Sequence, residues 1–304
     1  MSAIQVKKQH TLTGHKDCLY TLCRYSDSTF FSAGGDGMVV LWDLINPETG
    51  QMIVKVPSSV YAMAFSEKHN LLVVGQNFSG IHLINVDKKE EVGSLQLTNV
   101  AIFDIQITDE LIFVSTASGE LFQVDWNLNI IKSVKLSEVS VRTLAISPKG
   151  NELAVGSSDY QIRILDSHTL ETKKEFKAHE ISVFSLRYHP QMPVLISTSR
   201  DARYKVWDID NDYQLVEEVV GHMYAINHLD FSPDEKYFAT CSMDKSVKVW
   251  DAQEFRLLKV IDKARHAGHA TTSVNKLLWM DYHNWLVSCS DDRTISVWEI
   301  EHSV

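Results

Sequence analysis

The sequence is poor in the signals that mark a secreted, membrane-bound or metal-binding protein. It has only four cysteines, and no two of them form a C-x-x-C pair: Cys18, Cys23, Cys241 and Cys289. Each cysteine lies among apolar residues, so we expect four buried free thiols. Free thiols indicate a reducing compartment, and we therefore expect a cytoplasmic location. The first ten residues lack the apolar core of a secretory signal, and no apolar run reaches the length of a membrane span.

Excess positive charge and catalytic motifs are also missing. Lys and Arg number 29 against 39 Asp and Glu, which gives a formal charge of −10. This balance argues against a nucleic-acid partner, because nucleic-acid-binding domains present a basic surface. The sequence has no glycine-rich phosphate loop, H-E-x-x-H or G-x-S-x-G motif. An H-x-x-H at His266 and His269 has no third ligand nearby, so we expect neither a metal ion nor a cofactor.

What the sequence does contain is a repeat. Its clearest copy, Gly221–Asp251, opens on Gly-His, closes on Trp-Asp and holds three short alternating runs rich in β-branched and aromatic residues. The alternation predicts strands, and one meander of such strands cannot bury its apolar face without neighbours of the same kind. Positions equivalent to Trp250 occur at 42, 84, 124, 165, 207, 250 and 298, so that seven copies occupy nearly the whole chain.

The period, the opening Gly-His and the closing Trp-Asp resemble the WD-repeat (WD40) family, strongly in repeats 1, 5, 6 and 7 and less so in repeats 2, 3 and 4. The resemblance implies an all-β fold, a seven-bladed β-propeller of four-stranded antiparallel blades that forms a single domain over residues 1–304. The last repeat has no room for a fourth strand, whereas residues 4–12 form an extra strand before the first repeat. We therefore expect the N-terminal strand to pair into the last blade and close the ring.

Four residue types recur at fixed spacing in the strong repeats: an opening His, a hydroxyl residue, an Asp four positions later and a Trp six positions after that. In WD-repeat proteins they form a buried relay from Trp through hydroxyl and His to Asp, in which the hydroxyl accepts from the indole N–H and donates onward. The four sets are His15, Ser32, Asp36 and Trp42; His179, Ser197, Asp201 and Trp207; His222, Thr240, Asp244 and Trp250; and His269, Ser288, Asp292 and Trp298. A hydrolase triad is the alternative, but a triad occurs once per active site and this set occurs four times.

A further group of positions follows from the resemblance. In WD-repeat proteins the residue five positions after the His points to one mouth of the central channel, where many members bind a peptide, and the residue before the turn Asp lies on the same face. The first kind of position is occupied by Tyr20, Tyr61, Phe103, Arg142, Phe184, Asn227 and Asn275, and the second kind by Ser158, Arg200, Met243 and Asp291. Aromatic and arginine side chains dominate binding hot spots, although the rings could also simply fill the channel wall.

These observations predict a non-enzymatic interaction scaffold that binds a protein or peptide at the channel mouth. Two arginines at these positions, Arg142 and Arg200, favour a partner that brings a carboxylate or phosphate. Two alternatives stay open: an enzyme or small-molecule binder that uses the central channel, and a structural subunit that packs its blade rims into a larger assembly. The fold alone does not separate them, and the sequence determines neither the partner nor the oligomeric state.

Overall fold

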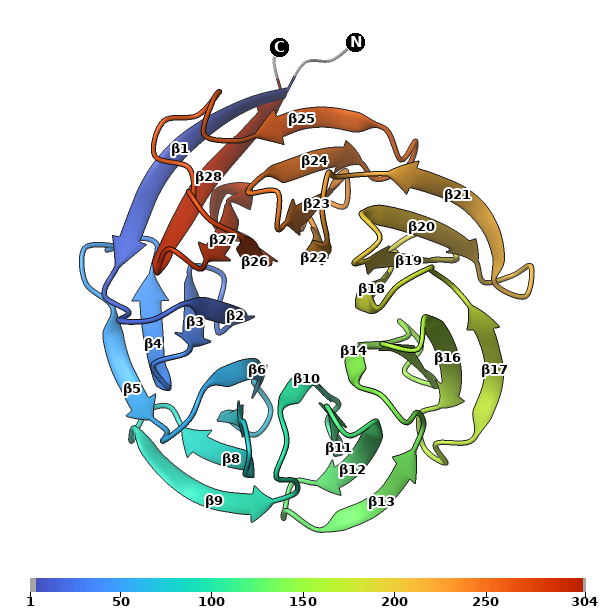
Figure 1. Ribbon diagram of the computed structural model, residues 1–304. Coiled ribbons are helices and arrows are strands. Elements are labelled where there is room, and N and C mark those ends of the chain that lie inside the picture. The colour runs from blue at the N-terminus through green and yellow to red at the C-terminus, as the bar shows by residue number, and fades with distance from the viewer. Residues whose placement is uncertain (1–3, 303–304) are drawn as a thin grey trace.

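The computed structural model describes residues 4–302, which form a ring of seven four-stranded antiparallel sheets around a central channel (Figure 1). The predicted all-β propeller is therefore confirmed. In six blades the strands follow one another in sequence from the channel outward, and in the seventh the N-terminal strand is outermost. The innermost strand of every blade faces the channel.

Blades 1 to 6 each contain four consecutive strands. Blade 1 comprises β2 (Leu19–Arg24), β3 (Thr29–Gly34), β4 (Met38–Asp43) and β5 (Gln51–Lys55). Blade 2 comprises β6 (Val60–Ser66), β7 (Leu71–Gln76), β8 (Gly80–Asn85) and β9 (Glu90–Gln96). Blade 3 comprises β10 (Ile102–Ile107), β11 (Leu111–Thr116), β12 (Glu120–Asp125) and β13 (Ile130–Lys135). Blade 4 comprises β14 (Val141–Ile146), β15 (Glu152–Ser157), β16 (Gln161–Asp166) and β17 (Thr172–Lys177).

The remaining blades complete the ring. Blade 5 comprises β18 (Val183–Tyr188), β19 (Val194–Ser199), β20 (Arg203–Asp208) and β21 (Gln214–Val220). Blade 6 comprises β22 (Ile226–Phe231), β23 (Tyr237–Ser242), β24 (Val247–Asp251) and β25 (Leu257–Ile261). Blade 7 comprises β26 (Val274–Trp279), β27 (Leu286–Ser290), β28 (Thr294–His302) and β1 (Ile4–Thr13), with a short 3-10 turn at Tyr282–Asn284 before β27.

The ring closes as expected. Strand β1 pairs antiparallel with β28, so that Lys8 lies opposite Trp298 and Leu12 opposite Ile295. The N- and C-terminal segments consequently run side by side at the outer edge of blade 7 (Figure 1). This pairing covers an edge of β28 that would otherwise present unpaired backbone groups.

Apolar packing between neighbouring blades forms the core. One cluster joins Ile196 and Val206 of blade 5 to Ile226, Phe238 and Trp250 of blade 6. The second strand of a blade is the most deeply buried, as in β19 and β23, where every residue is buried, whereas the outer strand β21 is almost fully exposed. Each blade thus buries both faces against its neighbours, which explains why one repeat cannot fold alone.

All four cysteines are free thiols. Cys241 and Cys289 are buried as expected, but Cys18 and Cys23 are partly exposed. Cys18 directly precedes β2, and Cys23 lies on β2 at the edge of the core cluster between blades 1 and 2. Within residues 4–302, no helix is long and apolar enough to cross a lipid bilayer.

Candidate functional site

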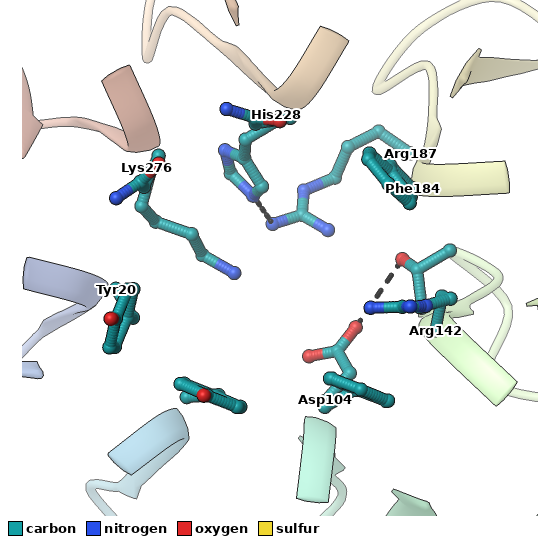
Figure 2. A pocket seen from close by; sticks show the side chains of 12 residues that line it. Tyr20, Asp104, Arg142, Phe184, Arg187, His228 and Lys276 are labelled. Atoms are coloured by element: carbon teal, nitrogen blue, oxygen red, sulfur yellow. Dashed lines mark hydrogen bonds between the residues drawn. The ribbon is translucent and has the colours of Figure 1, made fainter. Parts of the chain in front are cut away.

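A β-bulge interrupts the first strand of every blade at the same place. In each blade the ladder register shifts around a single residue, and those seven residues are the ones predicted at the channel mouth: Tyr20, Tyr61, Phe103, Arg142, Phe184, Asn227 and Asn275. A bulge leaves one residue outside the ladder and re-aims its side chain. All seven side chains line one cavity of about 310 Å³ at the end of the channel (Figure 2).

Five of these side chains form a continuous arc, which we call the aromatic–arginine arc: Tyr20, Tyr61, Phe103, Arg142 and Phe184. Tyr20 meets Tyr61 edge-on with ring centroids 4.8 Å apart, and Tyr61 stacks parallel to Phe103 at 6.0 Å. The Arg142 guanidinium carbon lies 4.1 Å from the ring centroid of Phe103 and 5.4 Å from that of Phe184. The arc therefore presents apolar ring surface with one cation held among the rings.

Arg142 is held by more than stacking. Its Nε donates to the Ser158 hydroxyl at 3.1 Å, which places the predicted Ser158 at this mouth. Burial, with the nearby charge of Arg200, lowers the pKa of Arg142. A planar cation that is both stacked and hydrogen-bonded has little freedom to move, which suits a binding surface.

The two amides on the other side of the cavity brace the blades. Asn227 donates to the Ser273 hydroxyl at 3.0 Å and to the Val274 carbonyl at 2.8 Å. Asn275 donates to Asp291 at 2.6 Å and to the Leu19 carbonyl across the closure of the ring at 2.8 Å. These side chains fix the position of blades 6, 7 and 1, and Asp291 belongs to that bracing.

Five further residues line the same cavity and were not predicted: Asp104, Thr143, Arg187, His228 and Lys276. Four of them directly follow a bulged residue, so the register of the bulge was the signal that could have found them. They also join neighbouring blades: Asp104 accepts from the Leu144 N–H at 2.8 Å, and Thr143 accepts from the Leu186 N–H at 3.3 Å.

Two of the predicted mouth residues lie outside the channel cavity. Arg200 and Met243 line a separate shallow depression together with Ile181, Met223 and Tyr224, on the turns of blades 5 and 6. They do not line the channel cavity itself, because the turn between the second and third strands lies farther from the channel axis than the first strand. Met243, Met223 and Tyr224 are exposed there.

The relay is present in blades 1, 5 and 6. In blade 5 the Trp207 indole donates to the Ser197 hydroxyl at 2.9 Å, His179 Nε2 lies 2.8 Å from the same hydroxyl, and His179 Nδ1 lies 2.9 Å from Asp201. Blades 1 and 6 have the same contacts at 2.8 to 3.0 Å through His15, Ser32, Asp36 and Trp42, and through His222, Thr240, Asp244 and Trp250. Each hydroxyl thus already accepts an indole N–H and is fully buried, an arrangement that braces a blade and gives a substrate no access to the hydroxyl.

The relay does not form in blade 7, which corrects the prediction for that repeat. His269 Nε2 faces the Lys245 carbonyl at 2.7 Å, and the buried Nδ1 of His269 and Nε1 of Trp298 have no hydrogen-bond partner within residues 4–302. Asp292 instead accepts from the Thr271 N–H at 3.0 Å. The physical reason is the longer connection between β25 and β26, which moves His269 away from Ser288. Asp292 stays at its turn.

Blade 4 carries a different network in the corresponding place. Arg163, which is buried, donates to Asp159 at 2.8 Å and to the two oxygens of Glu175 at 3.1 and 3.2 Å. Burial alone would lower the pKa of Arg163, but its two carboxylate partners outweigh it and raise the pKa. An ion-pair network thus replaces the relay in a blade that has no Trp.

Clustered metal ligands are absent from the described part of the chain: no three His, Cys, Asp or Glu side chains come together there as a metal site would require. His266 and His269, the H-x-x-H pair, instead pack their rings against Trp298, with centroids 5.8 and 5.5 Å from it.

Comparison with known proteins supports the repeat assignment. The family described as "WD domain, G-beta repeat" matches residues 6–43, 213–251 and 262–299. Residues 48–199, which include the weak repeats 2, 3 and 4, match the family described as "NUP159/214 beta propeller". Among solved structures, the WD40 β-propeller domain of Doa1 superposes with a TM-score of 0.85 over 97% of both chains, at 17% sequence identity, which supports the fold alone.

Curated relatives are similar at modest identity. Protein tipD of Dictyostelium discoideum is 24% identical over 96% of this chain and 49% of its own length. Human pre-mRNA-processing factor 17 is 29% identical over 79% of this chain and 44% of its own length. Nuclear distribution protein PAC1 of Arthroderma benhamiae is 28% identical over 54% of this chain and 36% of its own length. The match therefore spans half or less of each of these relatives. Seven blades, the relay residues and the family match together show that the chain belongs to the WD40-repeat β-propeller family.

Proposed function

We propose that this propeller is a non-enzymatic interaction module that binds a protein or peptide partner over the channel mouth. The aromatic–arginine arc carries the proposal, because five bulged side chains from consecutive blades form one concave surface. Aromatic and arginine side chains supply large contact area at low entropic cost, and concave sites allow their desolvation. The names of the relatives, a pre-mRNA-processing factor and a nuclear distribution protein, are consistent with a scaffold.

The residues that line the channel cavity offer less support for an enzyme. Asp104, the one carboxylate that lines the cavity, accepts hydrogen bonds from the backbone N–H groups of Leu144 and Ile105 at 2.8 and 2.9 Å. The Thr143 hydroxyl at 3.4 Å and the Gln106 amide at 3.5 Å are further donors, so each oxygen of Asp104 faces two donors, whereas a general base needs a free lone pair for the proton of a substrate. The site is thus better suited to holding a ligand than to transferring its protons.

A second candidate function, packing by the blade rims, rests on the outer strands. Ile131 on β13 and Val216 on β21 are each 57% exposed, beside the exposed Ile130 and Leu215. Apolar side chains on an exposed edge strand favour association with another chain. The rim and the mouth lie on different surfaces, so variants can separate the two functions.

The test compares three versions of the protein in affinity purification from the native cell. The mouth variant is Phe184→Ala with Arg142→Ala, and the matched rim variant is Ile131→Ser with Val216→Ser. We expect a co-eluting partner to be lost from the mouth variant alone, and its affinity for the purified protein, measured by calorimetry, to fall in parallel. A partner lost only from the rim variant would instead establish rim packing, and one retained by the mouth variant would contradict the proposal.

A further inference from the structure

We propose that the inner part of this mouth is an oxyanion site, in which a carboxylate or phosphate of the bound partner sits between Arg187, His228 and Lys276. The inference rests on the proposed function, because it takes the anion to be part of the protein or peptide partner. It adds which group of the ligand enters the channel and which side chains receive it.

The first support is local charge. Three cations line the cavity, Arg142, Arg187 and Lys276, against the single carboxylate of Asp104, in a chain whose formal charge is −10. The carboxylate of Asp104 accepts hydrogen bonds from the backbone N–H groups of Leu144 and Ile105 and from the Thr143 hydroxyl, the last at 3.4 Å. The residues that line the cavity thus carry more positive than negative charge on an acidic protein, with Asp230 behind Arg187 as a further carboxylate. Low-dielectric walls strengthen the field that these cations present to an anion.

The second support is Lys276. Its ammonium group points toward the middle of the channel (Figure 2) and makes neither a hydrogen bond nor an ion pair with any residue between 4 and 302. Surrounding protein lowers its pKa, which Asp104 raises only in part. A cation that is surrounded by protein and has no partner destabilises the fold. Such destabilising groups occur at functional sites, where a ligand supplies the missing partner.

The third support is the pair formed by His228 and Arg187. His228 is buried, and donors face both of its ring nitrogens: the Leu277 N–H lies 3.3 Å from Nδ1, and Arg187 Nη2 lies 3.0 Å from Nε2. A neutral imidazole has one lone pair, so only one of these contacts can be a hydrogen bond. An oxyanion beside Arg187 resolves the conflict, because Nδ1 then accepts from Leu277 while Nε2–H and Arg187 both donate to the anion.

Arg187 is available for this role. Its other contacts are to its own neighbour, the Leu186 carbonyl, at 3.0 Å, and to Asp230 at 3.8 Å from Nε. Asp230 already accepts from the Trp279 N–H at 2.8 Å. The guanidinium points into the channel from the side opposite Tyr20 (Figure 2). Its two Nη groups can therefore receive an anion while Nε stays beside Asp230.

A cationic ligand suits the mouth less well. The aromatic faces that would hold it already contact the guanidinium of Arg142, and the nearest unpaired charge, Lys276, is also positive. A methylated lysine or an arginine would meet like charge on both sides, which costs binding free energy. The same surroundings attract an anion.

The test has two parts, and the first uses inorganic phosphate as the probe in isothermal titration calorimetry. We compare the wild-type protein, Lys276→Gln, Arg187→Gln and the control Lys149→Gln, which changes an exposed lysine outside the cavity. We expect phosphate to bind the wild type and the control equally. We expect its affinity for each mouth variant to be lower by roughly tenfold or more. Because Lys276 makes no bond, its variant keeps the fold, which circular dichroism checks. Undetectable phosphate binding to the wild type, or equal binding to Lys276→Gln, would overturn the inference.

The second part identifies the source of the anion and separates this inference from the proposed function. A random peptide library, displayed with and without phosphorylated serine and threonine, is selected on the wild type, on Lys276→Gln and on Phe184→Ala. We expect the selected peptides to carry a phosphate or a carboxylate and to be lost from both variants. Peptides lost only from Phe184→Ala, with no acidic group, would overturn the oxyanion site and leave the proposed function standing. Phosphate binding that depends on Lys276, without any selected peptide, would instead overturn the peptide-binding function.

Discussion

The guanidinium of Arg142 lies over the ring of Phe103, with 4.1 Å between the arginine Cζ and the ring centroid. Both residues are the bulged positions of neighbouring blades, so the contact exists because two blades carry the same irregularity side by side. The stack gives the arc a rigid centre, since the Ser158 hydroxyl fixes the same guanidinium from the side at 3.1 Å. Rigid, preorganised contacts lose little entropy on binding.

Replacing Arg142 by Lys tests that geometry without changing the charge. A lysine ammonium cannot stack flat on Phe103 while it donates to Ser158, so we expect Arg142→Lys to weaken binding of a selected peptide about tenfold. Fluorescence anisotropy with the labelled peptide measures the effect. Arg203→Lys, on the surface of blade 5, is the control and should bind as the wild type does. Equal affinity of Arg142→Lys and wild type would show that charge alone matters at this position.

The relay gives a matched pair of stability variants. Ser197 accepts from Trp207 and contacts His179, whereas the hydroxyl of Ser288 in blade 7 makes, within residues 4–302, a single long contact at 3.5 Å to the Ser296 carbonyl. We expect Ser197→Ala to lower the free energy of unfolding by about 2–3 kcal/mol, because two buried partners lose their hydrogen bonds, and Ser288→Ala by less than about 1 kcal/mol. Urea denaturation measures both. Equal losses would mean that the relay contributes nothing beyond packing.

Acid should weaken the relay blades. Burial lowers the pKa of His179 although Asp201 opposes the effect, so the unfolded chain binds this proton more readily than the folded one. Burial would raise the pKa of Asp201, but its bonds to His179 outweigh that and lower the pKa to about 2. Both shifts have the same sign. Stability should fall as the pH drops below about 6.5, where unfolded histidine gains a proton, and fall further below about 4, where unfolded aspartate does.

Urea midpoints between pH 8 and pH 3 test this dependence. The His179→Gln variant is the control, because it removes one titrating histidine and should flatten the slope between pH 7 and pH 5. A midpoint that stays constant down to pH 5 in the wild type would contradict the expected linkage.

Lys276 links stability to binding. Its ammonium lies unpaired among protein groups, so we expect Lys276→Met to raise the free energy of unfolding by about 1–3 kcal/mol. The same variant should lose phosphate binding, which is the pattern of a residue retained for a ligand. Thermal and urea unfolding measure the first effect, with Lys149→Met as the control on the surface. A destabilised Lys276→Met would mean that the lysine has a structural partner in the folded state.

Most of this fold could be predicted from the repeat. The Trp positions and the extra N-terminal strand were sufficient for seven blades and for their closure, because a ring of sheets leaves few other places for residues 4–12. The bulged residue of every blade was also found from its distance to the His or to the following apolar run. The pattern could not reveal Lys276 or His228, because only one position per blade was assigned to the channel and the bulge turns the next side chain inward as well.

Blade 7 shows where spacing alone misled the prediction. Its Asp, hydroxyl and Trp keep the expected intervals, but the connection before Val274 is longer, and the backbone path through it decides where His269 points. In blade 4 the structure contains a network that the sequence pattern did not predict. Arg163 has no counterpart in the relay pattern, so its ion-pair network with Asp159 and Glu175 could be recognised only from the pairing of β16 with β17.

The distribution of these networks predicts which blades open most readily. Blades 2 and 3 have no relay, since Phe78 and Ser118 stand at the Asp position, whereas blades 5 and 6 have complete ones. We expect amide hydrogens of β7 and β11 to exchange faster than those of β19 and β23, because blades 2 and 3 lack the buried relay from Trp through hydroxyl and His to Asp. The exchange rate of β15 in blade 4 should lie between these two groups, because the ion pairs of Arg163 stabilise that blade. Replacing Arg163 by Met should raise the exchange rate of β15 to that of β11. Hydrogen–deuterium exchange read by mass spectrometry resolves these strands. Equal protection of all four would show that packing between blades, rather than the network inside each blade, sets local stability.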